Sequence, residues 1–293
     1  MNNDLVLRDL TKVAIVREAR KIMITPELRA RFGPDFSVEV TRNQKYMTAY
    51  RFTYTSQGHA VVGYIVVPKK RATRAPTIVF NRGGSGEFGA ILIGWLFTGT
   101  IAALARAGYV VIASQYSGVA GGEGTDEMGG SDLHDVINLQ KIIKELPFCD
   151  AKKIGMYGFS RGGIMTYRIL QKTRWVRAAV VVSGPTDLFF NETYRPEMRK
   201  RFQKMFGGSR EEKRKRSVLY WYKEIPRTIP LLVLCGMKDW RVDPREAFRF
   251  AEKATGHFND FKLVAYPRGT HVLEEYEAPV NQEIVNWFNT FLK

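Results

Sequence analysis

Ser160 has the neighbours that a nucleophilic serine needs. Glycines stand two residues before and two residues after it, at Gly158 and Gly162. A nucleophile elbow requires this spacing, because a side chain at either position would collide where a strand turns sharply into a helix. The turn exposes the serine hydroxyl and points the next amide, that of Arg161, at a carbonyl oxygen under attack. Apolar patterns on both sides argue against a chance glycine-rich turn, so the sequence predicts a catalytic serine.

A serine hydroxyl is a weak nucleophile until a base takes its proton and a carboxylate orients that base. The chain has four histidines, and His271 is the one that directly follows the last predicted strand. For the acid, Asp239 lies three residues beyond Gly236, which ends the preceding strand, whereas Asp243 comes just before a proline and fits a helix N-cap. Serine, acid and histidine then follow in the chain order expected for successive strand ends. We therefore predict a triad of Ser160, Asp239 and His271.

The amides that would stabilise an oxyanion are expected in two places. One is Arg161, directly after the serine. The other is the loop after the first long parallel strand, where Arg82, Gly83 and Gly84 provide amides that can approach a substrate carbonyl. Substrate contacts are predicted at three aromatic residues, which are Tyr116, Phe189 and Trp240.

The same loop carries a pattern found in dinucleotide sites. Residues 84–89 match G-x-G-x-x-G between a predicted strand and a predicted helix. A dinucleotide fold also places an acidic residue ~20 positions further on, at the tip of the next strand. Here that strand ends at Ser114, Gln115 and Tyr116, so we expect no nucleotide cofactor. Metal-ligand spacings do not occur either, and we expect no metal.

Alternating strand and helix patterns are expected to hold these residues. Most of the strand patterns are continuous runs of Val, Ile and Leu, which is typical of strands covered on both faces. The alternation predicts an α/β domain with a mostly parallel central sheet flanked by helices. The predicted strands cover residues 48–55, 60–67, 77–81, 109–115, 153–159, 178–183, 230–236 and 261–266. The predicted helices cover residues 90–107, 131–146, 161–172, 244–255 and 279–292.

Two segments fall outside this alternation. Residues 4–31 have helical periodicity, which predicts an N-terminal helical extension over residues 1–36 before a main domain over residues 37–293. A helix lying on a membrane surface is the alternative for this extension. Residues 184–229 far exceed the usual connection of ~2–6 residues. We predict that they form a small helical cap near the site, with a solvated excursion away from substrate as the alternative.

The chain is strongly basic. Its 293 residues include 45 Lys or Arg against 29 Asp or Glu, which gives a formal charge of +16. A nucleic-acid surface is one interpretation, but no signature of a nucleic-acid-binding fold accompanies the charge. We expect no nucleic acid as partner and instead a basic enzyme surface that attracts anionic substrates.

Neither a membrane span nor a disulfide framework is expected. Residues 88–113 are apolar but are interrupted by Arg106, and Gly108 fits a helix cap before a core strand. The N-terminus shows no signal-peptide pattern, so the expected compartment is the cytoplasm. Two cysteines indicate neither a disulfide framework nor a zinc site. The oligomeric state is left open.

Together these motifs resemble the catalytic domain of the prolyl oligopeptidase family of serine hydrolases, over about residues 45–293. The doubled glycine after the serine turn and the D-x-x-V acid loop are more specific than G-x-S-x-G alone. The motifs are the hairpin at residues 54–58, the loop at 81–84, the elbow at 158–163, the acid loop at 239–242, and His271.

The resemblance implies an α/β-hydrolase fold and the same triad. It implies hydrolysis of carboxylic esters or of small peptide and acyl-amide bonds through an acyl-enzyme on Ser160. The chain has no repeats for the β-propeller of many family peptidases, which implies a more open site, and Arg82 stands where the family often has Tyr or His. Two alternatives are an acyltransferase with this triad and a non-catalytic protein that binds an anionic partner through basic residues 195–216.

Overall fold

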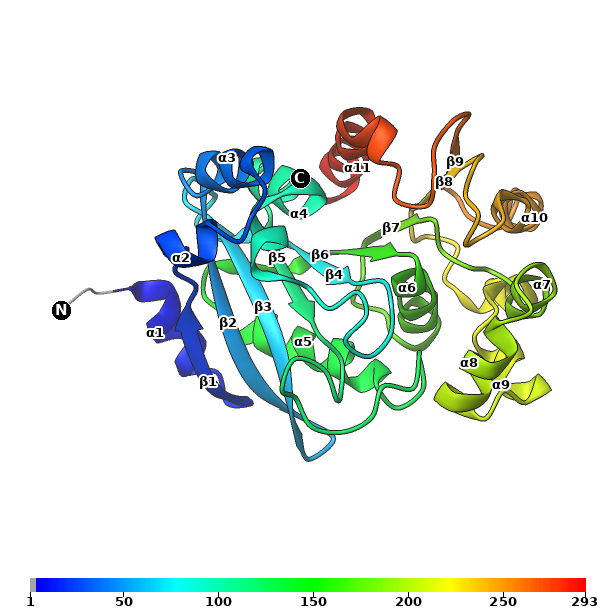
Figure 1. The fold of residues 1–293 in the computed structure, drawn as a ribbon, viewed down its shortest axis with the longest axis horizontal. Coiled ribbons are helices and arrows are strands. Elements are labelled where there is room, and N and C mark those ends of the chain that lie inside the picture. Colours follow the sequence, from blue (N-terminus) through cyan, green and yellow to red (C-terminus); the bar gives the residue numbers. More distant parts are fainter. Residues whose placement is uncertain (1–3) are drawn as a thin grey trace.

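A mixed sheet runs through the molecule, and helices cover both of its faces (Figure 1). The structure is a computed structural model that describes residues 4–293. Within these residues the sheet has nine strands in the order β1-β2-β3-β5-β4-β6-β7-β8-β9. The first three pair antiparallel and β3 pairs antiparallel with β5, whereas all later neighbours are parallel. The strands are β1 (Val16–Lys21), β2 (Met47–Ser56), β3 (His59–Pro68), β4 (Ala75–Asn81), β5 (Val110–Ser114), β6 (Cys149–Phe159), β7 (Ala178–Val182), β8 (Leu231–Gly236) and β9 (Phe261–Tyr266).

Two groups of helices pack on the two faces of the sheet. One apolar core lies between the sheet and α5, α6 and α10, and the other lies between the sheet and α3, α4 and α11. The α-helices are α1 (Leu5–Thr11), α2 (Pro26–Arg29), α3 (Pro34–Asn43), α4 (Gly99–Arg106), α5 (Leu133–Glu145), α6 (Arg161–Lys172), α7 (Leu188–Tyr194), α8 (Met198–Phe206), α9 (Arg210–Lys215), α10 (Pro244–Ala254) and α11 (Glu277–Leu292). Short 3₁₀ helices are η1 (Ile93–Phe97), η2 (Val218–Tyr220), η3 (Tyr222–Glu224) and η4 (Glu274–Tyr276).

The predicted mostly parallel sheet flanked by helices is confirmed. Every residue of β5, β7 and β8 is buried, as expected for runs of Val, Ile and Leu that helices cover on both sides. Parallel strands end at the same edge of a sheet, so the loops that follow β4, β6, β8 and β9 lie on one side of the molecule. The structure thereby brings the predicted site residues to a common edge.

The N-terminal extension differs from the helix predicted over residues 4–31. A helix is present at α1, but residues 16–21 form β1, which pairs antiparallel with β2. The extension is therefore partly a strand of the central sheet. Without β1, the strand β2 would leave a row of unpaired backbone groups at the edge of the sheet. Pairing with β2 therefore outweighs the weak local helical pattern of residues 16–21.

The helix predicted over residues 90–107 is also shorter than expected. The chain forms η1 first and starts α4 only at Gly99. Thr98 is extended and Gly99 has a φ of +54°, a left-handed conformation that interrupts a helix. None of the helices within residues 4–293 is long and apolar enough to cross a lipid bilayer.

Three short helices lie in the chain between β7 and β8. These are α7, α8 and α9, which Figure 1 shows at the end of the long axis opposite α1 and β1. Phe202 of α8 is fully buried and packs with Met128, Ile164, Leu188 and Met198. This small apolar cluster joins the inserted helices to Ile164 of α6 and so fixes α8 beside the N-terminal part of α6.

Candidate active site

The turn between β6 and α6 holds Ser160 in a strained conformation. Its φ of 54° and ψ of −123° are rarely adopted by residues other than glycine. The Ser160 amide donates to the carbonyl of Val182 at 2.8 Å, which fixes the turn to the neighbouring strand. A Cβ on Gly158 would collide with the carbonyl of Gly162, and a Cβ on Gly162 would collide with the carbonyl of Asn81. Both glycines are therefore needed for close approach of the helix and the strands.

Three side chains from separate loops form a hydrogen-bonded chain. His271 Nε2 lies 2.9 Å from Ser160 Oγ, and His271 Nδ1 lies 2.8 Å from Asp239 Oδ2. Asp239 is 3% exposed and His271 is 4% exposed. A carboxylate can only accept, so the neutral imidazole carries its proton on Nδ1 and leaves Nε2 free to accept from the serine hydroxyl. The arrangement lets His271 take a proton from Ser160.

The Asp239 carboxylate is held by its own loop. Its Oδ1 accepts hydrogen bonds from the amides of Arg241 at 2.8 Å and Val242 at 2.9 Å. The loops after β8 and β9 also touch, because a Cβ on Gly236 would collide with the carbonyls of Gly269 and the next residue. This contact between glycines, which the strand pattern did not reveal, brings Asp239 within reach of the histidine.

The loop after β4 packs directly against the serine. A Cβ on Gly83 would lie 3.2 Å from the Cβ of Ser160, and Gly84 has a φ of +68° that favours glycine. Within residues 4–293 the amides of Gly83 and Gly84 donate to no protein acceptor. Arg161 is the first residue of α6, so helix geometry leaves its amide without an intrahelical partner. These amides are free to donate to a substrate oxygen.

The side chain of Arg82 supports this loop from inside. Its guanidinium donates to the carbonyls of Gln115 at 2.8 and 3.0 Å, Gly83 at 3.0 Å and Gly86 at 3.1 Å. Burial lowers the pKa of Arg82 to about 10, so the group stays charged at neutral pH. Its bonds to these carbonyls fix the loop, and only the backbone of Arg82 is left to act on a substrate.

The side chain of Arg161 is neutralised by two aspartates that sequence reasoning missed. Its guanidinium pairs with Asp126 at 2.9 Å and with Asp132 at 2.6 Å, and all three groups are almost completely buried. Burial raises the pKa of Asp132 to about 6. The only sequence signal for this ion-pair cluster was the position of Asp126 and Asp132 in and just after the glycine-rich loop that precedes α5.

The predicted substrate contact at Tyr116 is wrong. Its side chain is fully buried, its hydroxyl donates to the carbonyl of Arg82 at 3.2 Å, and its ring lies 4.9 Å from the Arg82 guanidinium and 4.5 Å from that of Arg161. Tyr116 therefore supports the loop from below. Phe189 packs on Tyr220 and Trp240 is 59% exposed, and neither lines the cavities beside the serine.

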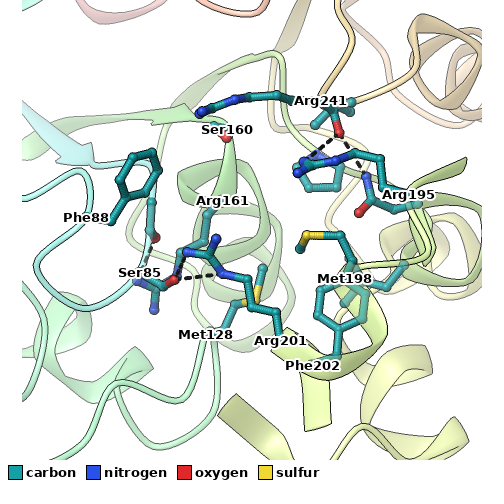
Figure 2. Close-up of a pocket in the computed structure, with 15 residues that line it drawn as sticks. Ser85, Phe88, Met128, Ser160, Arg161, Arg195, Met198, Arg201, Phe202 and Arg241 are labelled. Carbon is teal, nitrogen blue, oxygen red and sulfur yellow. Dashed lines mark hydrogen bonds between the residues drawn. The ribbon is translucent and has the colours of Figure 1, made fainter. Parts of the chain in front are cut away.

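Two cavities meet at Ser160. The larger, of about 440 Å³, is mainly apolar and reaches His271. The smaller, of about 170 Å³, lies between α6 and the inserted helices (Figure 2). Apolar residues of the larger cavity include Phe80, Ile91, Trp95, Ile101, Tyr157 and Phe159. Residues of the smaller cavity include Met128, Leu188, Met198, Phe202, Arg201 and Arg241.

Within residues 4–293 no group of three or more His, Cys, Asp or Glu side chains could hold a metal ion.

Comparison with known proteins identifies the family. A model of the prolyl oligopeptidase family matches residues 95–293, which is more than half of the chain. The chain is 25% identical over 254 residues to the uncharacterised peptidase YtmA of Bacillus subtilis, which covers 85% of this chain and 95% of YtmA. It is 24% identical over 261 residues to dipeptidyl-peptidase 5 of Porphyromonas gingivalis, which covers 83% of this chain and 38% of that protein.

Solved structures share the fold. An acylaminoacyl peptidase of Pyrococcus horikoshii matches with a TM-score of 0.75 and 21% identity, over 90% of this chain and 45% of that one. An esterase of Pyrococcus furiosus matches with a TM-score of 0.67 and 17% identity, over 86% of this chain and 95% of that one. The chain thus spans less than half of the acylaminoacyl peptidase and nearly all of the esterase. The α/β-hydrolase fold is confirmed, and the chain belongs to the prolyl oligopeptidase family of serine hydrolases.

Proposed function

We propose that this serine hydrolase cleaves carboxylic esters or small peptide and acyl-amide bonds through an acyl-enzyme on Ser160. The observation that supports the proposal is the continuous chain from Ser160 Oγ through the imidazole of His271 to the carboxylate of Asp239, with links of 2.9 and 2.8 Å. A base at hydrogen-bond distance from the hydroxyl and a carboxylate that orients the base are the two requirements for activating a serine.

In the proposed reaction, Ser160 Oγ attacks the substrate carbonyl while His271 Nε2 takes the hydroxyl proton. The tetrahedral oxyanion accepts hydrogen bonds from the amides of Arg161 and the Gly83–Gly84 loop. The protonated imidazole then gives its proton to the leaving amine or alcohol, and the bond to that group breaks. Water, deprotonated by the same imidazole, attacks the acyl-enzyme, and the imidazole returns this proton to Ser160 Oγ as the acyl bond breaks and the acid leaves. General-base catalysis typically contributes about 10²–10⁴-fold and one oxyanion donor about 10²–10³-fold.

The larger cavity favours a substrate with an apolar leaving group. His271 lines this cavity and delivers the proton to the leaving group, so that group lies on this side of the serine. The similarity to an acylaminoacyl peptidase and to dipeptidyl-peptidase 5 supports peptide and acyl-amide substrates, and the similarity to an esterase supports esters.

The proposal is tested by active-site labelling. A fluorophosphonate probe is expected to label the native protein and to leave Ser160→Ala unlabelled, while the control Ser209→Ala, which changes only the N-cap of α9, keeps its label. Turnover of p-nitrophenyl esters is then compared with turnover of aminoacyl- and dipeptidyl-anilides. A native protein that takes no label and turns over neither class would refute the proposal.

A further inference from the structure

The smaller cavity beside Ser160 is lined by positive charge. Its lining contains four arginines, Arg161, Arg195, Arg201 and Arg241, and no Asp or Glu. Two of them come from the segment between β7 and β8, one follows Ser160, and one lies in the acid loop at residues 239–242. Figure 2 shows Arg241 next to Ser160 and Arg201 below it, directed toward Ser85.

Two of these four charges are already neutralised. Arg161 is paired with two buried aspartates, as described above. Arg195 pairs with Glu197 at 2.7 Å. Within residues 4–293, neither Arg201 nor Arg241 has a carboxylate within salt-bridge distance. Both therefore bring an uncompensated positive charge to the cavity.

The contacts of Arg201 and Arg241 leave them available to a ligand. Arg201 Nε donates to the hydroxyl of Ser85 at 3.1 Å, which is a neutral partner. The Arg241 guanidinium lies over the rings of Phe88 at 5.4 Å and Trp240 at 4.9 Å and makes no hydrogen bond within the described residues. Stacking on aromatic faces holds a guanidinium in place while its N–H groups stay free to donate.

Arg201 also sits in an environment that disfavours its own charge. Burial is the main cause that lowers the pKa of Arg201, and the neighbouring guanidinium groups act in the same direction although Asp126 opposes them. A bound anion would relieve both effects, because it would neutralise the cluster and satisfy the donors. A cleft lined by one sign of charge also concentrates ligands of the opposite sign.

We propose that this cavity binds a carboxylate carried by the acyl part of the substrate, with Arg201 as its principal partner and Arg241 as the second. The proposal rests on the function proposed above. The acyl part is assigned to this cavity because His271, which protonates the leaving group, lines the other one. Met128, Leu188, Met198 and Phe202 would contact the aliphatic stem between the carbonyl and the carboxylate.

The substrate class that follows is an ester or amide of a short acyl group with an anionic end. A dicarboxylic half-ester has this chemistry, and so does a peptide with an Asp or Glu residue on the acyl side of the scissile bond. The volume of about 170 Å³ suits an acyl group of this length. Planar guanidinium groups suit carboxylates because they can donate two parallel hydrogen bonds.

The test compares two esters that differ in one charge. These are the p-nitrophenyl half-ester of glutaric acid and the p-nitrophenyl ester of monomethyl glutarate. We expect kcat/KM of the native protein to be higher for the acid, and Arg201→Gln to lower the acid-to-neutral ratio by about tenfold or more. Arg201→Glu should reverse the preference. The control Arg199→Gln, on the same helix but 79% exposed and paired with Glu192, should keep the native ratio.

A binding measurement separates this proposal from the proposed function. Calorimetry with glutarate on Ser160→Ala should detect binding that the added change Arg201→Gln weakens by a similar factor, whether or not either ester is hydrolysed. A native ratio at or below one, a ratio that Arg201→Gln leaves unchanged, or equal glutarate binding by the two variants would overturn the anion site. Absence of labelling at Ser160 with intact glutarate binding would instead overturn the catalytic proposal alone.

Discussion

At the scale of single residues, the orientation of the Asp239 carboxylate determines which ring nitrogen of the neutral His271 carries the proton. Asp239 has two oxygens with different partners, since Oδ1 accepts from two amides of its own loop and Oδ2 faces His271 Nδ1. The first set of bonds fixes the carboxylate, and the second selects the tautomer in which Nε2 is an acceptor. The proposed nucleophile therefore depends on a residue that it does not touch.

Asp239→Asn tests this dependence. The asparagine oxygen can keep the two amide bonds, and its NH₂ group would then face His271 Nδ1 and force the proton onto Nε2, where it cannot accept from Ser160. We expect kcat to fall by about 10⁴-fold with little change in the free energy of unfolding. Steady-state kinetics and chemical denaturation measure the two quantities.

The matched control for this variant is Asp243→Asn, which changes the N-cap of α10. Its side chain bonds to Arg245 and lies outside the triad. We expect this control to retain turnover within a few fold. A large loss of kcat in the control, or near-native kcat in Asp239→Asn, would contradict the assignment.

At the scale of elements, α10 anchors the start of the inserted helices through one buried carboxyl group. Glu246 Oε2 accepts from the amides of Thr186 at 2.8 Å and Asp187 at 3.0 Å, and Oε1 lies 3.3 Å from Asn191 Nδ2. Asn191 also lines the arginine-rich cavity. Full burial raises the pKa of Glu246 to about 8, well above its ordinary value of 4.5.

This carboxyl group should make stability depend on pH. Between its unfolded pKa and about 8 the folded state holds a proton that the unfolded state has lost, so the free energy of unfolding falls as pH rises through this range. The slope from this group is at most about 1.4 kcal/mol per pH unit. Glu246→Gln keeps an acceptor for the two amides and should remove this contribution.

The measurement is the difference in the free energy of unfolding between the native protein and Glu246→Gln, from pH 5 to pH 9. We expect the variant to gain relative to the native protein as pH rises to about 8, after which the difference levels off. A difference that is constant over the whole range would show that Glu246 has an ordinary pKa.

A structural feature could be predicted from the sequence where its physical cause lies within a few neighbouring residues. The strands of the parallel sheet were predictable because unbroken apolar runs have one explanation, and the glycines around Ser160 carry a steric requirement within five residues. The strand β1 was missed because its cause is the unpaired edge of β2, which lies far along the chain. Tyr116 was misassigned because its burial beneath Arg82 and Arg161 arises only when three loops meet. Nothing in the helical pattern of α8 shows that Arg201 lines the cavity beside Ser160.

At the scale of the whole molecule, positive charge is present both as a net excess over the chain and as a cluster of arginines in one cavity. The formal charge of +16 gives a long-range attraction for anions, and the arginine-lined cavity beside Ser160 is the proposed local binding site. The charged edge strand β1, with the sequence VREARK, also discourages pairing with other chains. In the proposed function, the same excess of basic residues would draw anionic substrates toward this cavity.

Added salt should affect the hydrolysis of an anionic ester more than that of a neutral one. Raising NaCl from 0.02 to 0.5 M shortens the screening length from more than about 10 Å to a few ångströms. We expect kcat/KM for the glutaric half-ester to fall several-fold and that for its neutral methyl ester to stay nearly constant. Parallel loss for both esters would indicate a general effect of salt on the enzyme rather than weakened attraction of an anion.

The placement of three helices between β7 and β8 has a consequence for how this enzyme could diversify. The hydroxyl, carboxylate and imidazole come from the loops after β6, β8 and β9, whereas Arg195, Arg201, Met198 and Phe202 come from the segment between β7 and β8. In the proposed site, most residues that would select the acyl group are therefore encoded apart from the triad, and only Arg161 and Arg241 lie beside triad residues. Laboratory evolution confined to codons 188–229 would explore new acyl preferences while the bond-breaking apparatus stays untouched.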